Sequence, residues 1–283
     1  MTFREIFSNY TTALQALYSK GEASAITHII FNHFAGLSKS QLAVSGDKIP
    51  DTATAAALQE SLEKLLNHIP VQYITGEAWF YNLKFRVNDQ VLIPRPETEE
   101  LVQEVVNYLK GTQGKTILDI GTGSGCIPIS IKKNVADAEI ISIDISVGAL
   151  QTAAENAAEN NVAIDFREMN FLDEETYHSL PVFDVIISNP PYIRENDKDS
   201  LDKNVILHEP HLALFVTQND PLLFYRKTFS FAKEHLAEKG KIFLEVHEDH
   251  AKETAAIYNE ENYLTEIKKD MQGKERMVIV SKR

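Results

Sequence analysis

The chain has 283 residues, of which 43% are hydrophobic and 24% are charged, so it can form one large globular domain or two smaller ones. Its 41 acidic and 28 basic residues give a formal net charge of −13, which argues against direct nucleic-acid binding through a general basic surface. No stretch approaches the ~18 apolar residues of a membrane-spanning helix, and we expect no membrane association. The single cysteine, Cys126, excludes an internal disulfide and indicates a cytoplasmic protein.

Residues 1–70 carry the pattern of a small all-α domain. Apolar residues recur at helical spacing around Leu14 and again around Ile30. Asp51 is a suitable N-cap for a third helix that ends near His68. We therefore predict an N-terminal helical domain over residues 1–70.

Residues 71–93 change character, because aromatic and β-branched residues from Tyr73 to Val87 are interrupted by Gly76 and Asn82. This pattern predicts a pair of strands, and we interpret 71–93 as a β-hairpin linker. Pro96 then suits the first turn of a helix that continues to Leu109.

From residue 115 onwards, short apolar segments alternate with helical ones. The candidate strands cover Thr116–Asp119, Glu139–Ile143, Ala163–Glu168, Val182–Ser188, Lys241–Val246, Thr265–Lys268 and Met277–Ser281. Apolar strands separated by helices predict an α/β domain with a parallel, doubly wound sheet over residues 94–283.

A glycine-rich turn follows the first of these strands and is the first candidate site. It contains Gly121, Thr122, Gly123, Ser124 and Gly125. Glycine lets the backbone approach a ligand closely, and the helix that follows offers free N–H groups. Asp144 ends the next strand, where an acidic residue can accept both hydroxyls of a ribose. The alternative is a tight strand-to-helix turn without a ligand, which the spacing to Asp144 disfavours.

The cofactor that fits this turn best is S-adenosylmethionine (SAM). The nicotinamide fingerprint requires a third glycine where this chain has Cys126. Asp119, two residues before the first glycine, suits the amino group of SAM better than a pyrophosphate. Phe171 follows the third strand and has two interpretations, a ring against adenine or an ordinary core aromatic. We interpret Cys126 as a packing residue rather than a nucleophile.

The tetrapeptide Asn189-Pro190-Pro191-Tyr192 ends the apolar strand Val182–Ser188 and is the second candidate site. The Asn189 side-chain oxygen and the Pro190 carbonyl can each accept one N–H of a planar NH2 group. These bonds aim the nitrogen at an electrophilic methyl and stabilise the positive charge that develops on it. The Tyr192 ring can lie against the planar acceptor. The alternative is a proline-terminated strand and an ordinary loop, which the neighbouring glycine turn disfavours.

Two weaker signals lie further along the chain. Glu209-Pro210 can shape a substrate slot, although a role in holding its loop is the simpler interpretation. His247 and His250 are three residues apart but lack an evident third ligand, so we predict no metal site.

Taken together, these segments resemble the HemK/PrmC family of protein-(glutamine-N5) methyltransferases along nearly the whole chain. The segments that carry the resemblance are Pro70–Glu77, Val91–Glu99, Asp119–Gly125, Asp144–Ser146 with Ala149-Leu150, Asn189–Tyr192, and Glu209-Pro210 with Ala213-Leu214. Each of them is unspecific alone, but their order and number make the resemblance specific.

The resemblance implies a class I SAM-dependent methyltransferase fold, Rossmann-like, with a mostly parallel seven-stranded sheet and a small N-terminal domain that binds the substrate. The implied substrate is the glutamine of the Gly-Gly-Gln motif of peptide chain release factors, whose methylation tunes translation termination. The cofactor contacts map onto Asp119, Gly121, Thr122, Gly123, Ser124, Gly125, Asp144, Phe171 and Asn189. Asn189, Pro190 and Tyr192 are the implied catalytic residues, and Pro191 joins them in binding the substrate.

Two positions depart from the family pattern. Phe171 stands where some members have tryptophan, which still allows stacking, and Asn170 replaces a common aspartate, which puts a contact with the adenine amine in doubt. We expect a monomer whose partner is the release factor. Three alternatives stay open: a glutamine methyltransferase of a ribosomal protein, an N6-adenine methyltransferase of nucleic acid, and a SAM-binding scaffold without turnover. The segment Pro96–Glu99 favours the release-factor enzyme over the ribosomal-protein enzyme.

Overall fold

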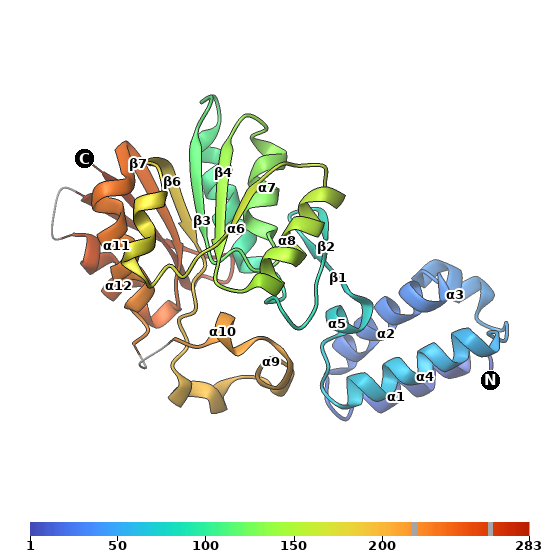
Figure 1. Ribbon diagram of the computed structural model, residues 1–283. Helices are drawn as coiled ribbons and strands as arrows, with labels where there is room; N and C mark the ends of the chain where they lie inside the picture. Colours follow the sequence, from blue (N-terminus) through green and yellow to red (C-terminus); the bar gives the residue numbers. More distant parts are fainter. Residues whose placement is uncertain (217–219, 260–262, 283) are drawn as a thin grey trace. The chain divides into compact units, whose positions relative to one another are not determined.

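The computed structural model describes residues 1–216, 220–259 and 263–282, and the chain divides into two compact units. Unit 1 comprises residues 1–76 together with residues 202–208. Unit 2 comprises residues 77–201 and the described residues from 209 onwards. Each unit is considered by itself below (Figure 1).

Unit 1 is helical. Its helices are α1 (Phe3–Leu14), α2 (Lys20–Ala35), α3 (Lys39–Ser45), α4 (Thr52–Leu66), α5 (Val71–Thr75) and α9 (Lys203–His208). The side chain of Asp51 accepts a hydrogen bond from the Thr54 N–H and so caps α4, because the first N–H groups of a helix have no partner within it. The rings and aliphatic side chains of Tyr10, Leu14 and Phe31 are fully buried at its centre.

One prediction for the linker is wrong. Tyr73 and Ile74 lie in the helix α5, not in a strand. This helix begins directly after Pro70 and ends at Gly76, whose φ of 70° is left-handed. Val71 is buried in the core of unit 1, so tertiary packing overrides the β-branched and aromatic composition of this short segment.

The predicted hairpin strands are present over a shorter range. Strand β1 (Glu77–Phe80) pairs antiparallel with β2 (Leu83–Arg86). The two connecting residues, Tyr81 and Asn82, have φ values of 50° and 61°, as tight two-residue hairpin turns require.

The sheet of unit 2 has seven strands in the order β5-β4-β3-β6-β7-β9-β8. The strands are β3 (Thr116–Ile120), β4 (Glu139–Asp144), β5 (Asp165–Glu168), β6 (Phe183–Ser188), β7 (Leu236–Glu245), β8 (Tyr263–Lys269) and β9 (Glu275–Lys282). The first five strands in this order are parallel, whereas β9 runs antiparallel to both of its neighbours. The predicted α/β fold with a mostly parallel sheet is therefore confirmed.

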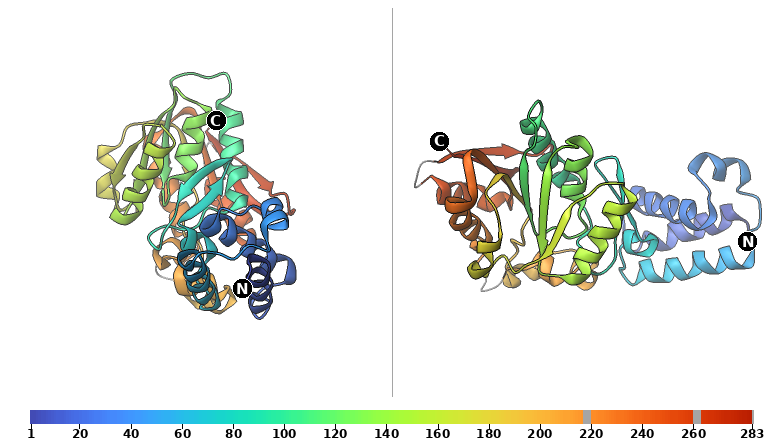
Figure 2. Two further views of the ribbon diagram at one scale, coloured as in Figure 1. Left: turned by 90° about the vertical axis from the view of Figure 1, so that its right-hand side faces the viewer. Right: turned by 45° about the horizontal axis from the view of Figure 1, so that its top comes forward.

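Helices cover both faces of this sheet (Figures 1 and 2). One face packs against α6 (Pro96–Leu109), α7 (Cys126–Asn134) and α8 (Val147–Glu159). The other face packs against the 3-10 helix η1 (Glu174–Ser179), α11 (Leu223–His235) and α12 (Ala251–Tyr258). The remaining short elements of unit 2 are η2 (Glu195–Ser200), α10 (His211–Leu214) and η4 (Glu248–His250).

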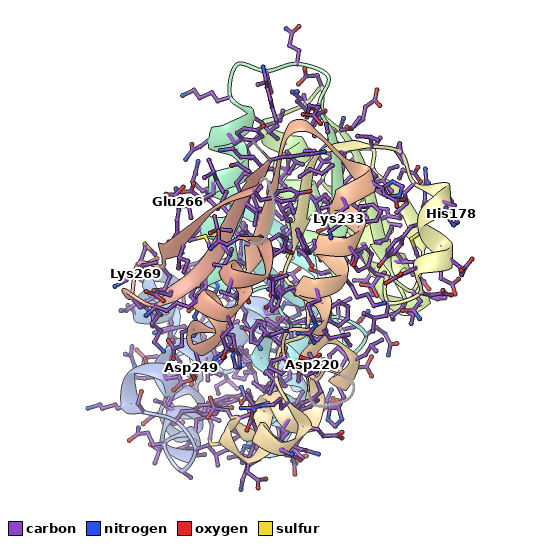
Figure 3. The ribbon with its side chains drawn as sticks, turned by 90° about the vertical axis from the view of Figure 1, so that its left-hand side faces the viewer. His178, Asp220, Lys233, Asp249, Glu266 and Lys269 are labelled. Atoms are coloured by element: carbon purple, nitrogen blue, oxygen red, sulfur yellow. The ribbon has the colours of Figure 1, made fainter. Side chains whose placement is uncertain are left out.

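One of the two edge strands, β8, carries charged side chains, including Glu266 and Lys269 (Figure 3). Charges on an edge strand oppose pairing with another chain. None of the described helices combines the length and the apolar character that crossing a membrane requires.

The strand register brings four segments to one edge of the sheet. Ile120 pairs with Ile143 and with Ser188, and Ser188 pairs with Leu244. The next residues on these parallel strands are therefore neighbours in one row, and they are Gly121, Asp144, Asn189 and Glu245. Ligands of open α/β sheets bind at this carboxyl edge, so the register places the candidate site.

Gly125 precedes α7 and lies close against Ala153 of α8. Its φ is 79°, and a Cβ added there would lie 2.9 Å from Ile129 Cδ1 and 3.1 Å from Ala153 Cβ. We expect Gly125→Ala to lower the free energy of unfolding by about 2 to 4 kcal/mol, from left-handed strain and overpacking together. Gly114→Ala is the matched control, because its φ is 60° but no atom of the described residues lies within 4 Å of the added carbon. Urea unfolding of both variants tests this, and equal losses would contradict it.

Candidate active site

The glycine turn is attached to the end of β4. Both Gly121 and Thr122 donate their N–H groups to the Ile143 carbonyl, at 2.9 and 3.1 Å. A Cβ added to Gly121 or Gly123 would meet no described atom within 4 Å, so this side of the turn is open. The turn therefore has one face packed against the protein, through Gly125, and one face on which a ligand fits.

Asp144 is held in place by backbone N–H groups. Its Oδ2 accepts the Gly123 N–H and its Oδ1 accepts the Ser146 N–H, both at 2.9 Å. Each carboxylate oxygen keeps a lone pair after accepting one bond. Burial raises the pKa of Asp144, and the backbone N–H groups oppose that shift. The carboxylate is thus oriented beside the glycine turn, and its contact with a ribose stays a prediction.

Asp119 is fully buried and only partly satisfied. The Ser142 hydroxyl donates to its Oδ2 at 2.5 Å, whereas its Oδ1 has no hydrogen-bond partner among the described residues. Burial raises the pKa of Asp119 to about 6, although the hydroxyls of Ser142 and Thr122 lower it. A buried acceptor without a donor is costly, so a bound ammonium group would supply what this carboxylate lacks. The residues around the turn therefore fit a cofactor that carries an amino group and a ribose.

The remaining residues of the turn are buried as well. Ser124 accepts a hydrogen bond on its carbonyl from the Asn156 side chain, at 2.8 Å. Asn156 also exchanges hydrogen bonds with the backbone of Arg86 on β2, so it ties the turn to the hairpin. Our sequence reasoning missed Asn156, although a polar side chain amid the alanines of α8 was a usable signal. The Cys126 thiol is buried, and burial raises its pKa to about 12, which leaves it an unreactive packing residue.

Phe171 lies in the core on the α11 side of the sheet. Its ring centroid is 5.2 Å from that of Tyr177 and 5.6 Å from that of Phe231. The Tyr177 hydroxyl donates to the Phe171 carbonyl at 2.7 Å. The structure therefore shows the core interpretation of Phe171, and contact with an adenine ring stays a prediction.

Asn189 follows β6, is half-buried, and is linked to two buried side chains. Its Nδ2 donates to the Thr98 Oγ1 at 3.2 Å, and the Thr98 hydroxyl donates to the Glu245 Oε2 at 2.6 Å. The Ser188 hydroxyl donates to the Ile120 carbonyl at 2.8 Å and holds the end of β6 against β3. The structure thus brings Asn189, the glycine turn and Asp144 to the same edge of the sheet.

Thr98 and Glu245 were not among the predicted site residues. Thr98 lies in the conspicuous segment Pro96–Glu99, to which the sequence attached no individual role. Glu245 is a carboxylate within an apolar strand, and such residues are almost never fully buried unless paired. Burial raises the pKa of Glu245 to about 7, and the hydrogen bond from Thr98 lowers it.

Tyr192 borders a cavity of about 640 Å³. The other walls come from η2, from η4 with Asp249 (Figure 3), and from Arg276 on β9. Burial raises the pKa of Tyr192 to about 12, so its hydroxyl is neutral at physiological pH. An aromatic ring, a guanidinium and several polar side chains line this cavity.

Glu209 holds the loop that follows the tetrapeptide. Its side chain is 1% exposed, lies 2.6 Å from Arg95 Nη2 and accepts the Ile93 N–H at 3.2 Å. The two ends of the same loop are also joined, because the Ile193 N–H donates to the Leu214 carbonyl and the Ile193 carbonyl accepts the Val216 N–H. Of the two interpretations of Glu209, the structure therefore shows the one in which it anchors the loop.

The two histidines cap and pair locally. His247 Nδ1 accepts the Asp249 N–H at 3.3 Å, and His250 Nδ1 lies 2.7 Å from Glu253 Oε2. Across the described ranges no three His, Cys, Asp or Glu side chains gather in a way that could hold a metal ion.

This sheet, with a glycine turn after β3 and Asn-Pro-Pro-Tyr after β6, defines a methyltransferase of the class I fold. Residues 98–214 match the methyltransferase small domain, and residues 5–76 match the PrmC N-terminal domain. A methyltransferase structure from Pyrococcus furiosus is similar in fold, with a TM-score of 0.51 and 16% identity over 79% of this chain and 98% of that one.

Two relatives are similar over nearly the whole chain. The release factor glutamine methyltransferase of Flavobacterium psychrophilum is 40% identical over 285 residues, or 99% of both chains. The release factor glutamine methyltransferase of Bacteroides thetaiotaomicron is 35% identical over 95% of this chain and 96% of its own. The chain therefore belongs to the release factor glutamine methyltransferase family, and the resemblance inferred from its motifs is confirmed.

The buried carboxylate of Asp119 makes a prediction about stability. Because its pKa in the folded protein, about 6, lies above the ordinary 3.8, the folded state binds this proton more tightly than the unfolded state does. The contribution of this protonated carboxyl to the free energy of unfolding is fully present below about pH 4 and is lost as the pH rises through 6. We expect the free energy of unfolding of Asp119→Asn to rise by about 2 to 3 kcal/mol relative to that of the wild type as the pH goes from about 4 to 7. The difference should grow by about 1.4 kcal/mol for each pH unit between the two pKa values. Urea unfolding of the ligand-free proteins measures this, and parallel pH curves would refute it.

Proposed function

We propose that this protein transfers a methyl group from SAM to the side-chain amide nitrogen, N5, of the glutamine in the Gly-Gly-Gln motif of peptide chain release factors. The observation that carries the proposal is the state of the Asn189 amide. Its nitrogen is already used as a donor to Thr98, whereas its Oδ1 accepts no hydrogen bond from the described residues. An acceptor oxygen is thus presented beside the glycine turn, where an NH2 group needs one. The names of the relatives support the choice of substrate.

The residues that would hold SAM are those of the turn and its neighbours. The open side of Gly121 and Gly123 admits the ligand, Asp119 Oδ1 accepts an N–H of its ammonium group, and Asp144 accepts its ribose hydroxyls. When bound, SAM supplies a methyl group on a sulfonium, which passes to the amide nitrogen as the S–C bond breaks and the nitrogen then loses one proton to solvent.

The tetrapeptide would orient the acceptor. Asn189 Oδ1 and the Pro190 carbonyl each accept one N–H of the glutamine amide, and Pro191 and the Tyr192 ring bound its planar faces. An amide nitrogen is a weak nucleophile because its lone pair is delocalised. These residues would therefore act mainly by fixing the direction from which the nitrogen approaches and by stabilising the charge that develops on it. The cavity beside Tyr192 receives the residues that flank the glutamine.

The two units would have different functions, with the site for methyl transfer in unit 2 and part of the substrate-binding surface in unit 1. Unit 1 is proposed to help bind the release factor, and several of its apolar side chains are exposed, including Val44 at 85% and Ile49 at 75%. We propose further that the protein acts as a monomer in the cytoplasm.

The experiment that tests this function uses labelled SAM and a purified bacterial release factor. Three parallel reactions contain the same factor with its Gly-Gly-Gln glutamine replaced, a large-subunit ribosomal protein, and DNA. Label on the intact factor alone is the expected result. Label on DNA or on the ribosomal protein would replace the substrate, and SAM binding without label on any of them would indicate a scaffold.

The role of Asp144 gives a separate prediction. Asp144→Ala removes both carboxylate oxygens, and we expect the free energy of SAM binding to weaken by about 1 to 3 kcal/mol, which is roughly 5- to 150-fold in affinity. Asp144→Asn keeps one acceptor oxygen and should lose less. Titration calorimetry measures both variants, and thermal melts verify that the turn is still folded. Wild-type affinity in Asp144→Ala would overturn this role.

A further inference from the structure

Two buried polar side chains and one half-buried one, from distant parts of the sequence, meet at the carboxyl edge of the sheet. Asn189 follows β6, Thr98 lies in the first turn of α6, and Glu245 ends β7. Thr98 and Glu245 are 2% and 4% exposed. Buried polar groups are costly unless they hydrogen-bond. Here Asn189 bonds to Thr98 at 3.2 Å, and Thr98 bonds to Glu245 at 2.6 Å.

The order of donors and acceptors in these two hydrogen bonds is fixed, because each group can donate or accept only in certain ways. An ionised carboxylate only accepts hydrogen bonds, so Glu245 takes the single proton of the Thr98 hydroxyl. The Thr98 oxygen is then left with lone pairs alone, so the atom that faces it on Asn189 has to be a donor. Of the two ends of the amide, only Nδ2 satisfies that requirement, and Oδ1 is turned away from Thr98.

We propose that Thr98 and Glu245 are positioning residues that fix the orientation of the Asn189 amide, so that its oxygen rather than its nitrogen meets the NH2 group of the substrate. This inference rests on the proposed function. With the amide turned by 180°, Asn189 would present an NH2 group to another NH2 group, and neither could accept. Methyl transfer would then lose one of the two acceptors that aim the glutamine nitrogen.

The surroundings make this arrangement rigid. Pro96 sets the first turn of α6, and the Thr98 N–H bonds to the Arg95 carbonyl at 3.1 Å. Parallel pairing of β6 with β7 brings Asn189 and Glu245 into the same row. The Tyr225 hydroxyl donates to the Glu245 carbonyl at 3.1 Å and holds the end of β7 from the other side.

The orientation depends on the charge of Glu245. A protonated carboxyl can donate to Thr98, whose hydroxyl proton is then free to turn towards Asn189 and favours the reversed amide. The charged groups around Glu245 are Arg276 on β9, Arg95 and Glu97 at the start of α6, and the neutral phenols of Tyr192 and Tyr225 lie beside them. The two arginines favour the ionised form and Glu97 opposes it, while burial raises the pKa of Glu245 to about 7.

The test compares two substitutions of Thr98 in the full-length protein. Thr98→Val keeps the shape but removes the hydroxyl, and Thr98→Ser keeps the hydroxyl. With saturating SAM and release factor, we expect Thr98→Val to lower kcat by roughly 10- to 100-fold and Thr98→Ser to stay within about 3-fold of the wild type. The Kd for SAM, measured by calorimetry, should be unchanged in both, because the hydrogen bonds of Thr98 among the described residues go to Asn189, Glu245 and Arg95 and not to the glycine turn.

The pH dependence supplies a readout that packing alone would not change. As Glu245 ionises, kcat of the wild type should rise as the pH passes through about 7. Glu245→Gln should lack that rise, because a glutamine does not titrate. Saturating SAM separates this effect from the titration of Asp119, which acts on SAM binding.

The outcomes separate the inference from the proposed function. If the wild type labels no release factor, the proposed function fails, and the inference fails with it. If the wild type is active and Thr98→Val has a wild-type kcat, only the positioning role is overturned. The role is also overturned if Thr98→Ser loses as much kcat as Thr98→Val, or if the rise in kcat near pH 7 persists in Glu245→Gln.

Discussion

The register of the parallel strands is the constraint on which the rest of this structure depends. Because β3, β4, β6 and β7 run in the same direction and are paired without an offset at their ends, Gly121, Asp144, Asn189 and Glu245 fall in one row. A slip of one residue on any of these strands would move its terminal residue out of the row and would turn its apolar side chains to the other face. The buried packing on both faces of the sheet opposes such a slip, so the hydrophobic core also sets the geometry of the site.

The polar groups at this edge are held at a cost in stability. Asp119 and Glu245 are both deeply buried, and burial raises the pKa of each carboxyl. Asp119 keeps one oxygen without a partner among the described residues, as expected where a ligand rather than the protein completes the hydrogen bonding. Glu245 is instead satisfied by Thr98, which is consistent with a role in orienting a neighbour rather than in holding a ligand. Two buried carboxylates with raised pKa values, one of them with an unpaired oxygen, are thus placed at the edge where the family performs its chemistry.

Around this edge, a second set of contacts stabilises the loops that carry no regular structure. Glu209 links the segment before α6 to the loop after the tetrapeptide through Arg95 and the Ile93 N–H. Asn156 links the glycine turn to the hairpin strand β2. Each anchor is a buried side chain that bonds to backbone or to an opposite charge far away in the sequence. The active-site loops are therefore positioned by a few specific bonds, and the hydrophobic core supports them from below.

The sequence by itself determined the fold class, the seven strands and the family, because apolar periodicity, glycine turns and Asn-Pro-Pro-Tyr are local patterns with local physical causes. It misassigned Tyr73 and Ile74, where packing of a five-residue helix outweighed β propensity. It left Phe171 open between two interpretations, and only the burial of the ring against Tyr177 and Phe231 showed its place in the core. Thr98 and Glu245 were decided by the tertiary structure alone. The bond from Asn189 to Thr98 joins residues 91 positions apart, and the bond from Thr98 to Glu245 joins residues 147 positions apart. Nothing in the sequence near these residues encodes which distant group each will meet.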